Sequence, residues 1–127
     1  MGERILGVDP GTLRMGYGLL ETGHPEPRCL TWGALTASRS RPIGERLLSL
    51  QEGLRKILEE WNPQVVAVEQ PYIPRRDSSV RSAIAVGQAQ GVALMVAAWA
   101  GVPVFSYTPA QVKQTVTEYG RSSKEQV

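Results

Sequence analysis

A short apolar run that ends on one carboxylate and stops at a tight turn constrains this chain most. Residues 5–8 (Ile-Leu-Gly-Val) are followed by Asp9, Pro10 and Gly11, which is the pattern of a β-strand stopped by a turn. Asp9 is therefore expected at a strand end, with rigid backbone behind it and open space in front. Metal-dependent phosphate chemistry needs a carboxylate so placed, although Asp-Pro-Gly is also a common turn without a catalytic role.

A second strand of the same kind predicts a partner for Asp9. Residues 65–68 (Val-Val-Ala-Val) open just after Asn62-Pro63 and end on Glu69, as a buried central strand would. Residues just past the strand ends of an α/β sheet line the crevice where ligands bind. Neighbouring strands would bring Asp9 and Glu69 within reach of a shared cation. The alternative is that Glu69 only ends its strand and faces water.

The segment between these acids predicts an antiparallel start to the sheet. Residues 15–21 and 28–37 favour two further strands, and the spacer 22–27 holds one Gly and two Pro, as a hairpin loop does. Hairpin connections between three consecutive strands make them antiparallel. His24 is expected to be solvated in the loop, while Cys29 and Trp32 are expected to be strand residues without chemistry.

A polar linker, residues 38–42, leads into a predicted helix. Its apolar residues recur at steps of three or four and form one stripe: Ile43, Leu47, Leu50, Leu54, Leu58 and Trp61. The helix should end at Asn62-Pro63. Because the strand at 65–68 follows a helical crossover, we expect the sheet to become parallel or mixed and to be covered by helices.

The next loop, residues 70–79, contains two prolines and carries Tyr72, Arg75 and Arg76. Arg pairs with phosphate and Tyr can stack on an unpaired base, so this composition suits nucleic acid. An ordinary solvated loop with Tyr72 packed on the core is the alternative.

Residues 79–100 predict a helix with scarcely any polar face, beginning near Asp77 or Ser78. A helix that is apolar all round is buried or lies at an interface. We expect this helix either to contact the sheet on one side and a second subunit on the other, or to be completely buried within one chain. A fifth strand at 102–107, a short helix from Pro109 to about Val116 and a last helix after Gly120 complete the prediction.

Composition limits the remaining possibilities. The 127 residues suit one domain, 1–127, and the net charge is +2. Residues 70–127 contain six basic and three acidic side chains, whereas residues 1–69 contain eight basic and nine acidic side chains. An anionic partner is therefore expected at the second half.

One cysteine and one histidine exclude an internal disulfide and a Cys/His zinc site. We expect a cytoplasmic protein without a signal peptide, and the apolar segment 92–101 is too short to span a membrane.

These motifs, taken in order, resemble the RuvC family of Holliday junction resolvases, DNA endonucleases of the RNase H-like fold. The matching segments are Gly7-Val8-Asp9-Pro10-Gly11, Gly16-Tyr17-Gly18, Val66-Ala67-Val68-Glu69-Gln70, Gly87-Gln88-Ala89-Gln90-Gly91-Val92-Ala93, Val102-Pro103-Val104, Gln111-Val112-Lys113-Gln114-Thr115-Val116, Lys124 and Gln126-Val127. The resemblance covers essentially the whole chain. It implies an α/β, RNase H-like, mixed five-stranded sheet whose first three strands are antiparallel, flanked by helices.

The resemblance also implies a site and partners. In the family four acids hold two divalent ions, usually Mg²⁺ or Mn²⁺, and Asp9 and Glu69 match the first two acids. Tyr72 matches an aromatic that inserts at the junction, and Lys113 and Lys124 match lysines that face the DNA; Arg75 and Arg76 are added from their charge and loop position. The implied partners are four-way junction DNA, a second copy of the chain in a homodimer, and the RuvA-RuvB branch-migration complex.

The sequence departs from the family pattern at its C-terminal end. The family's third and fourth acids lie in a helix beyond the point where this sequence stops, so we expect a C-terminally truncated form that holds half of the metal site. Two other functions stay open. The chain could bind junctions without cutting them, or it could be an actin-like phosphate-binding protein, because Asp-x-Gly-Thr also opens the phosphate loop of those ATPases.

Overall fold

The computed structural model describes residues 2–69 and 80–107. In chain order the elements are β1 (Arg4–Asp9), β2 (Arg14–Glu21), β3 (Arg28–Thr36), α1 (Ile43–Trp61), β4 (Val65–Glu69), α2 (Val80–Trp99) and β5 (Val104–Tyr107). Each agrees with a predicted element to within a few residues. The two helices predicted after residue 108 lie outside the described residues.

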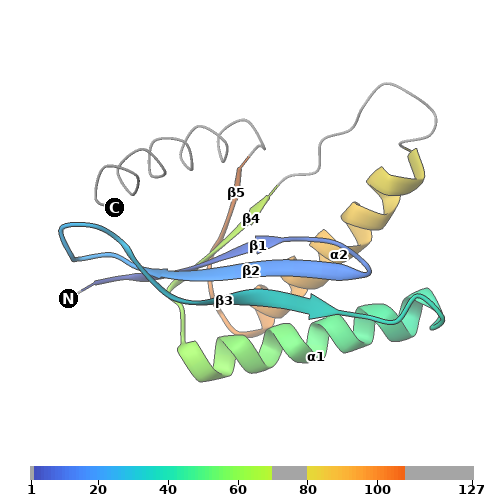
Figure 1. The fold of residues 1–127 in the computed structure, drawn as a ribbon, viewed down its shortest axis with the longest axis horizontal. Coiled ribbons are helices and arrows are strands. Elements are labelled where there is room, and N and C mark those ends of the chain that lie inside the picture. Colours follow the sequence, from blue (N-terminus) through green and yellow to red (C-terminus); the bar gives the residue numbers. More distant parts are fainter. Residues whose placement is uncertain (1, 70–79, 108–127) are drawn as a thin grey trace.

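The five strands form one mixed sheet in the order β3-β2-β1-β4-β5 (Figure 1). β1 is antiparallel to β2, and β2 is antiparallel to β3. β4 is parallel to both β1 and β5. The mixed sheet with three antiparallel strands at its start is therefore confirmed. Since β1 and β4 are parallel neighbours, their carboxyl ends meet at one edge of the sheet.

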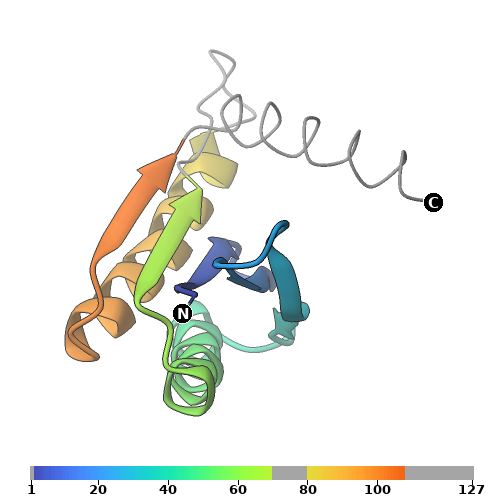
Figure 2. The same cartoon turned by 90° about the vertical axis from the view of Figure 1, so that its left-hand side faces the viewer.

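Both helices pack on the same face of this sheet. α1 contacts β3 and α2, and α2 contacts β4 and β5. The view in Figure 2 looks almost along α1, with α2 behind β4 and β5. Strand alternation places every second residue of β1 and β4 under the helices: Leu6, Val8, Val66 and Val68 are buried.

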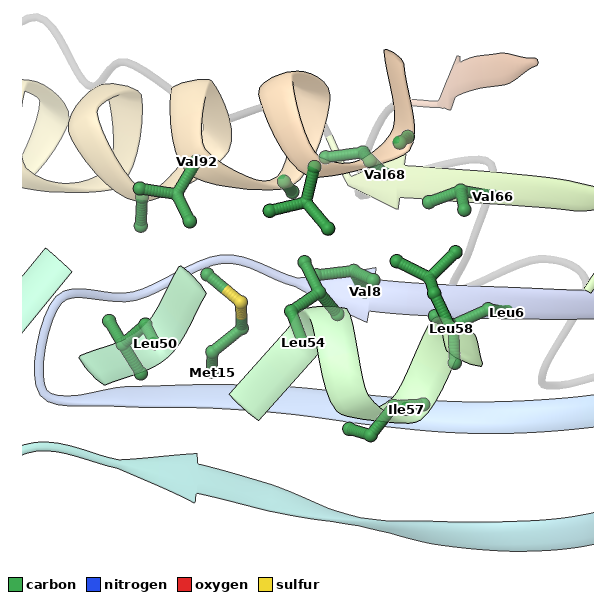
Figure 3. Close-up of a cluster of buried hydrophobic side chains, with 14 of the residues drawn as sticks. Leu6, Val8, Met15, Leu50, Leu54, Ile57, Leu58, Val66, Val68 and Val92 are labelled. Carbon is green, nitrogen blue, oxygen red and sulfur yellow. The ribbon is translucent and has the colours of Figure 1, made fainter. Parts of the chain in front are cut away.

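The core lies between the helices and the central strands (Figure 3). From α1 it receives four buried side chains, which are Leu50, Leu54, Ile57 and Leu58. Ile57 was not in the predicted stripe, although it lies three residues after Leu54 and on the same side of the helix. Met15 of β2 and Val92 of α2 fill the space between α1 and the sheet.

Left-handed residues end both helices. Asn62 closes α1 with φ 48° and ψ 58°, and its N–H donates to the Leu58 carbonyl. Gly101, at φ 72°, follows α2. The N–H of Gly101 donates to Ala98 and that of Val102 to Ala97, which is the Schellman pattern. These stops turn the chain directly into β4 and β5.

Three details correct the sequence-based expectations. α2 is not completely buried, because Ile84 and Met95 are 58% and 60% exposed; the alternative of complete burial is wrong. α2 is also long and apolar enough to cross a membrane, unlike the shorter segment considered above, but a core helix passes the same test, and α2 packs on the sheet. Finally, His24 is half-buried, and its Nε2 lies 3.0 Å from Glu21 Oε1.

Candidate active site

The parallel register of β1 and β4 brings Asp9 and Glu69 together. Val8 pairs with Val68, and each acid is the next and last residue of its strand. Val8 and Val68 point into the core, so strand alternation directs both acids to the opposite face. The two carboxyl groups lie close enough for Asp9 to raise the pKa of Glu69. The predicted meeting of the two acids at one edge of the sheet is thus present in the structure.

The electrostatics of this pair favour a positive charge beside it. Burial is the largest cause that raises the pKa of Glu69, followed by the hydrogen bond to Asp9 and the negative charge of Asp9. Two adjacent carboxylates repel each other when both are ionised, and a proton on Glu69 or a bound cation would relieve that repulsion. Glu69 is only partly buried, which leaves the pair open to a ligand from solvent.

The turn after Asp9 is held by close backbone packing. A side chain at Gly11 would collide with the carbonyl oxygen of Arg14, so only glycine fits there. Thr12 is buried, and its Oγ1 accepts a hydrogen bond of 3.4 Å from Nη1 of Arg46 on α1. The backbone N–H of Ala37 donates to Leu13 at 2.9 Å. These contacts connect the turn to α1 and to the end of β3, and they fix the backbone that carries Asp9.

Tyr107 is a site residue that the sequence analysis missed. It pairs with Glu69 in the β4–β5 ladder and so faces the same side of the sheet. A Cβ built at Gly7 of β1 would lie 3.9 Å from the Tyr107 hydroxyl, which shows that the side chain reaches across β4. Burial, then the charges of Glu69 and Asp9, raise the pKa of Tyr107 above 10.0. The phenol is therefore a neutral hydrogen-bond donor beside the acid pair at physiological pH.

A sequence signal for Tyr107 did exist. It ends the fifth strand, which is parallel to the strand of Glu69, and parallel strands end at the same edge. The same rule that selected Asp9 and Glu69 therefore selects Tyr107. The contact between Thr12 and Arg46 had no such signal, because 34 residues separate them and no pattern connects them.

The other predicted site residues cannot be placed. Tyr72, Arg75 and Arg76, and the lysines Lys113 and Lys124, all lie outside the described residues. Within residues 2–69 and 80–107, no group of three or more His, Cys, Asp or Glu side chains could hold a metal ion. Asp9 and Glu69 nevertheless fit a divalent cation, because carboxylate oxygens are the ligands that Mg²⁺ and Mn²⁺ prefer and a cation would relieve the repulsion between them.

Comparison with known families decides the relationship of the chain. The family described as crossover junction endodeoxyribonuclease RuvC matches residues 5–127. The chain belongs to the RuvC family. A RuvC of Thermomicrobium roseum is 44% identical over 124 residues, which cover 98% of this chain and 74% of that protein. A RuvC of Chloroflexus aurantiacus is 45% identical over the same shares. An actin-like phosphate-binding protein is not supported by these relationships.

Solved structures agree with the RuvC assignment. The T. thermophilus RuvC in complex with a Holliday junction substrate matches with a TM-score of 0.76 at 32% identity, over 88% of this chain and 68% of that one. The yeast mitochondrial Holliday junction resolvase Ydc2 matches with a TM-score of 0.64 at 16% identity, over 94% of this chain and 59% of that one. Because the identity with Ydc2 is only 16%, this similarity shows a shared fold alone. The predicted RNase H-like architecture is confirmed.

Proposed function

We propose that this RuvC-family nuclease resolves four-way (Holliday) junctions in recombination and DNA repair by nicking two opposing strands. The observation that supports this most is the contact between Asp9 and Glu69 at the ends of adjacent parallel strands. Two carboxylates held together at an open sheet edge repel each other. Such an arrangement is typical of a metal site, where a bound cation removes the repulsion.

Asp9 and Glu69 would hold Mg²⁺ or Mn²⁺, with two ions per site when the family's further acids are present. A bound divalent ion polarises the phosphate and lowers the pKa of water. The rigid turn after Asp9 orients one carboxylate, and the β-ladder to β1 orients the other. Tyr107 can donate a hydrogen bond to an anionic oxygen at this edge without losing its proton.

DNA recognition beyond this edge follows the family resemblance. Tyr72 would stack at the opened junction, and Arg75, Arg76, Lys113 and Lys124 would contact phosphates, which set position and affinity but not sequence preference. We further propose one nuclease domain, 1–127, a cytoplasmic location, and association with the RuvA-RuvB branch-migration complex.

A homodimer fits both the substrate and the surface of α2. A four-way junction has two-fold symmetry, and two symmetric cuts require two copies of one site. The exposed side of α2 carries the large apolar residues Val80, Ile84, Leu94 and Met95. Gly87 and Gly91 lie among them with open space above. This face, opposite the sheet, allows close approach of a second α2.

The decisive experiment measures binding and cutting separately on a synthetic four-way junction. We expect the protein to bind the junction and, when the family's further acids are present, to produce paired nicks only with Mg²⁺ or Mn²⁺. Asp9→Asn and Glu69→Gln should abolish cutting, by at least about 100-fold, and leave binding intact. Cutting by Asp9→Asn at the original rate would disprove the assigned site. Binding by the unmodified chain without any cutting would instead support a junction-binding fragment.

A further inference from the structure

The end of the sheet that carries the acid pair also carries a group of arginines. β1 ends at Asp9, β2 begins at Arg14 and α1 begins at Ile43, so the β1–β2 turn and the β3–α1 connection lie at the same end (Figure 1). Within residues 2–69 and 80–107, the arginines at this end are Arg14, Arg39, Arg41, Arg46 and Arg81.

Five of the nine acidic residues of the first half lie at the opposite end, and Glu52 lies in the middle of α1. Glu21 pairs with Arg4, the first residue of β1, and Arg4 also donates to the carbonyl of Trp61 at the end of α1. Glu3, Glu26, Glu59 and Glu60 belong to this same end. Among residues 2–69 and 80–107, only Glu45 joins Asp9 and Glu69 at the arginine end. The nearly balanced charge of the first half is thus separated along the strands.

Three of these arginines are free to bind an anion. Arg14, Arg39 and Arg41 are exposed, and none of the ion pairs in the described part of the chain includes them. Arg46 differs, because its guanidinium is engaged with Thr12. An exposed guanidinium without an acidic partner offers all of its donors to a phosphate.

Backbone pairing fixes the position of Arg14 relative to Asp9. Asp9 pairs with Gly16, and a Cβ built there would lie 3.6 Å from the Asp9 Cβ. Arg14 is two residues away and so faces the same side of the sheet. It pairs with Thr36 at the end of β3, just before the loop that holds the other two arginines.

The loop after β3 is itself ordered by hydrogen bonds. The N–H of Arg41 donates to the Ser38 carbonyl at 3.1 Å, and the N–H of Ser40 donates to the Ser38 hydroxyl at 3.3 Å. The hydroxyls of Ser38 and Ser40 lie 2.7 Å apart. This turn holds Arg39 and Arg41 between the end of β3 and the start of α1, at the end of the sheet that carries the acid pair.

We propose that Arg14, Arg39 and Arg41 bind the phosphodiester backbone of a duplex arm that leaves the junction on the β3 side of the active site. The inference rests on the proposed function. It adds a contact surface in the first half of the chain, where the charge count alone predicted none. Guanidinium groups that neutralise phosphates release condensed counterions, so the surface should appear in the salt dependence of binding.

The test compares two variants that remove the same charge. Arg39→Ala/Arg41→Ala removes two arginines of the proposed surface. Arg28→Ala/Lys56→Ala removes two exposed basic residues that are also absent from the ion pairs of the described chain; Arg28 begins β3 at the opposite end of the sheet, and Lys56 lies on the outer side of α1. Dissociation constants for a four-way junction are measured between 50 and 200 mM salt, a range of roughly the usual width for such slopes, without divalent metal.

We expect the slope of log Kd against log salt to fall by about two for Arg39→Ala/Arg41→Ala, by about one for Arg14→Ala and by none for the control. An equal fall of this slope in both double variants would show that only the net charge matters, and it would overturn the proposed surface. Unchanged slopes in the arginine variants would also overturn it. If the unmodified protein does not bind the junction, the proposed function itself fails, a result that is distinct from either outcome.

Discussion

At the scale of single residues, the acid pair makes stability depend on pH. Burial and the adjacent Asp9 raise the pKa of Glu69 above its ordinary value of 4.5. The folded protein holds this proton more tightly than the unfolded chain does. The stabilising contribution is therefore complete below about pH 4.5 and is lost as the pH rises through the folded-state pKa of Glu69.

Glu69→Gln should consequently stabilise the metal-free protein at neutral pH. The gain in free energy of unfolding is expected to be about 1 kcal/mol or less, because the pair is partly solvated. It should disappear below pH 4.5. Thermal unfolding in EDTA at pH 4 and pH 7.5 measures both values. A variant that is less stable than the parent at pH 7.5 would show that Glu69 is not held against a like charge.

The same pair predicts how a cation acts on the fold. Mg²⁺ or Mn²⁺ bound by Asp9 and Glu69 would remove the repulsion between the two carboxylates. Added cation should therefore raise the unfolding temperature of the parent protein and have little effect on Glu69→Gln. This comparison reports binding directly, without depending on DNA cleavage, and serves as the control for the pH experiment.

At the scale of secondary structure elements, α1 is held by the one side that faces the sheet. Leu54 projects from α1 toward the central strands and is fully buried (Figure 3). Leu48, on the same helix, is 57% exposed. Leu54→Ala should lower the free energy of unfolding by about 2–5 kcal/mol, because it leaves a cavity in the core. Leu48→Ala should change it by about 0.5 kcal/mol or less. Chemical denaturation of both variants measures the difference, and similar losses would place α1 differently on the sheet.

Periodicity was sufficient to predict these elements because each has a distinct apolar pattern. The strand that ends at Asp9 is followed by Pro10 and Gly11, and the strand that ends at Glu69 is a short apolar run. α1 shows one clear apolar stripe with the polar residues opposite. Parallel pairing of β1 and β4 then followed from the helical crossover. The acid pair could be predicted for this reason, since strand direction alone decides which residues meet at an edge.

The remaining features depend on contacts that leave no local pattern. α2 is apolar on all sides, so its sequence could not decide which side faces the sheet; the structure buries Ala93 and Val96 and exposes Ile84 and Met95. The separation of charge along the strands was hidden in the count for residues 1–69. His24 was expected in solvent because it lies in a hairpin loop. Its contact with Glu21 at the start of that loop leaves no pattern in the sequence.

At the scale of the whole molecule, the exposed side of α2 predicts how two copies meet. Its large apolar residues would face water in a monomer, and large exposed apolar patches commonly mark interfaces. If this side joins two α2 helices, the two acid pairs belong to one two-fold symmetric particle. Their simultaneous action on opposing strands then depends on contacts that are remote from the chemistry.

Ile84→Glu/Met95→Glu should therefore separate the dimer without unfolding the monomer. Both side chains are more than half exposed, so the glutamates remain solvated in the monomer, whereas in a dimer they would bring like charges into an apolar contact. Sedimentation velocity at micromolar concentration should show a dimer for the parent and a monomer for the variant, and the variant should no longer cut in pairs. Leu48→Glu, an equally exposed site on α1, should remain dimeric. A dimeric Ile84→Glu/Met95→Glu protein would move the interface away from α2, while the site formed by Asp9 and Glu69 would be unaffected.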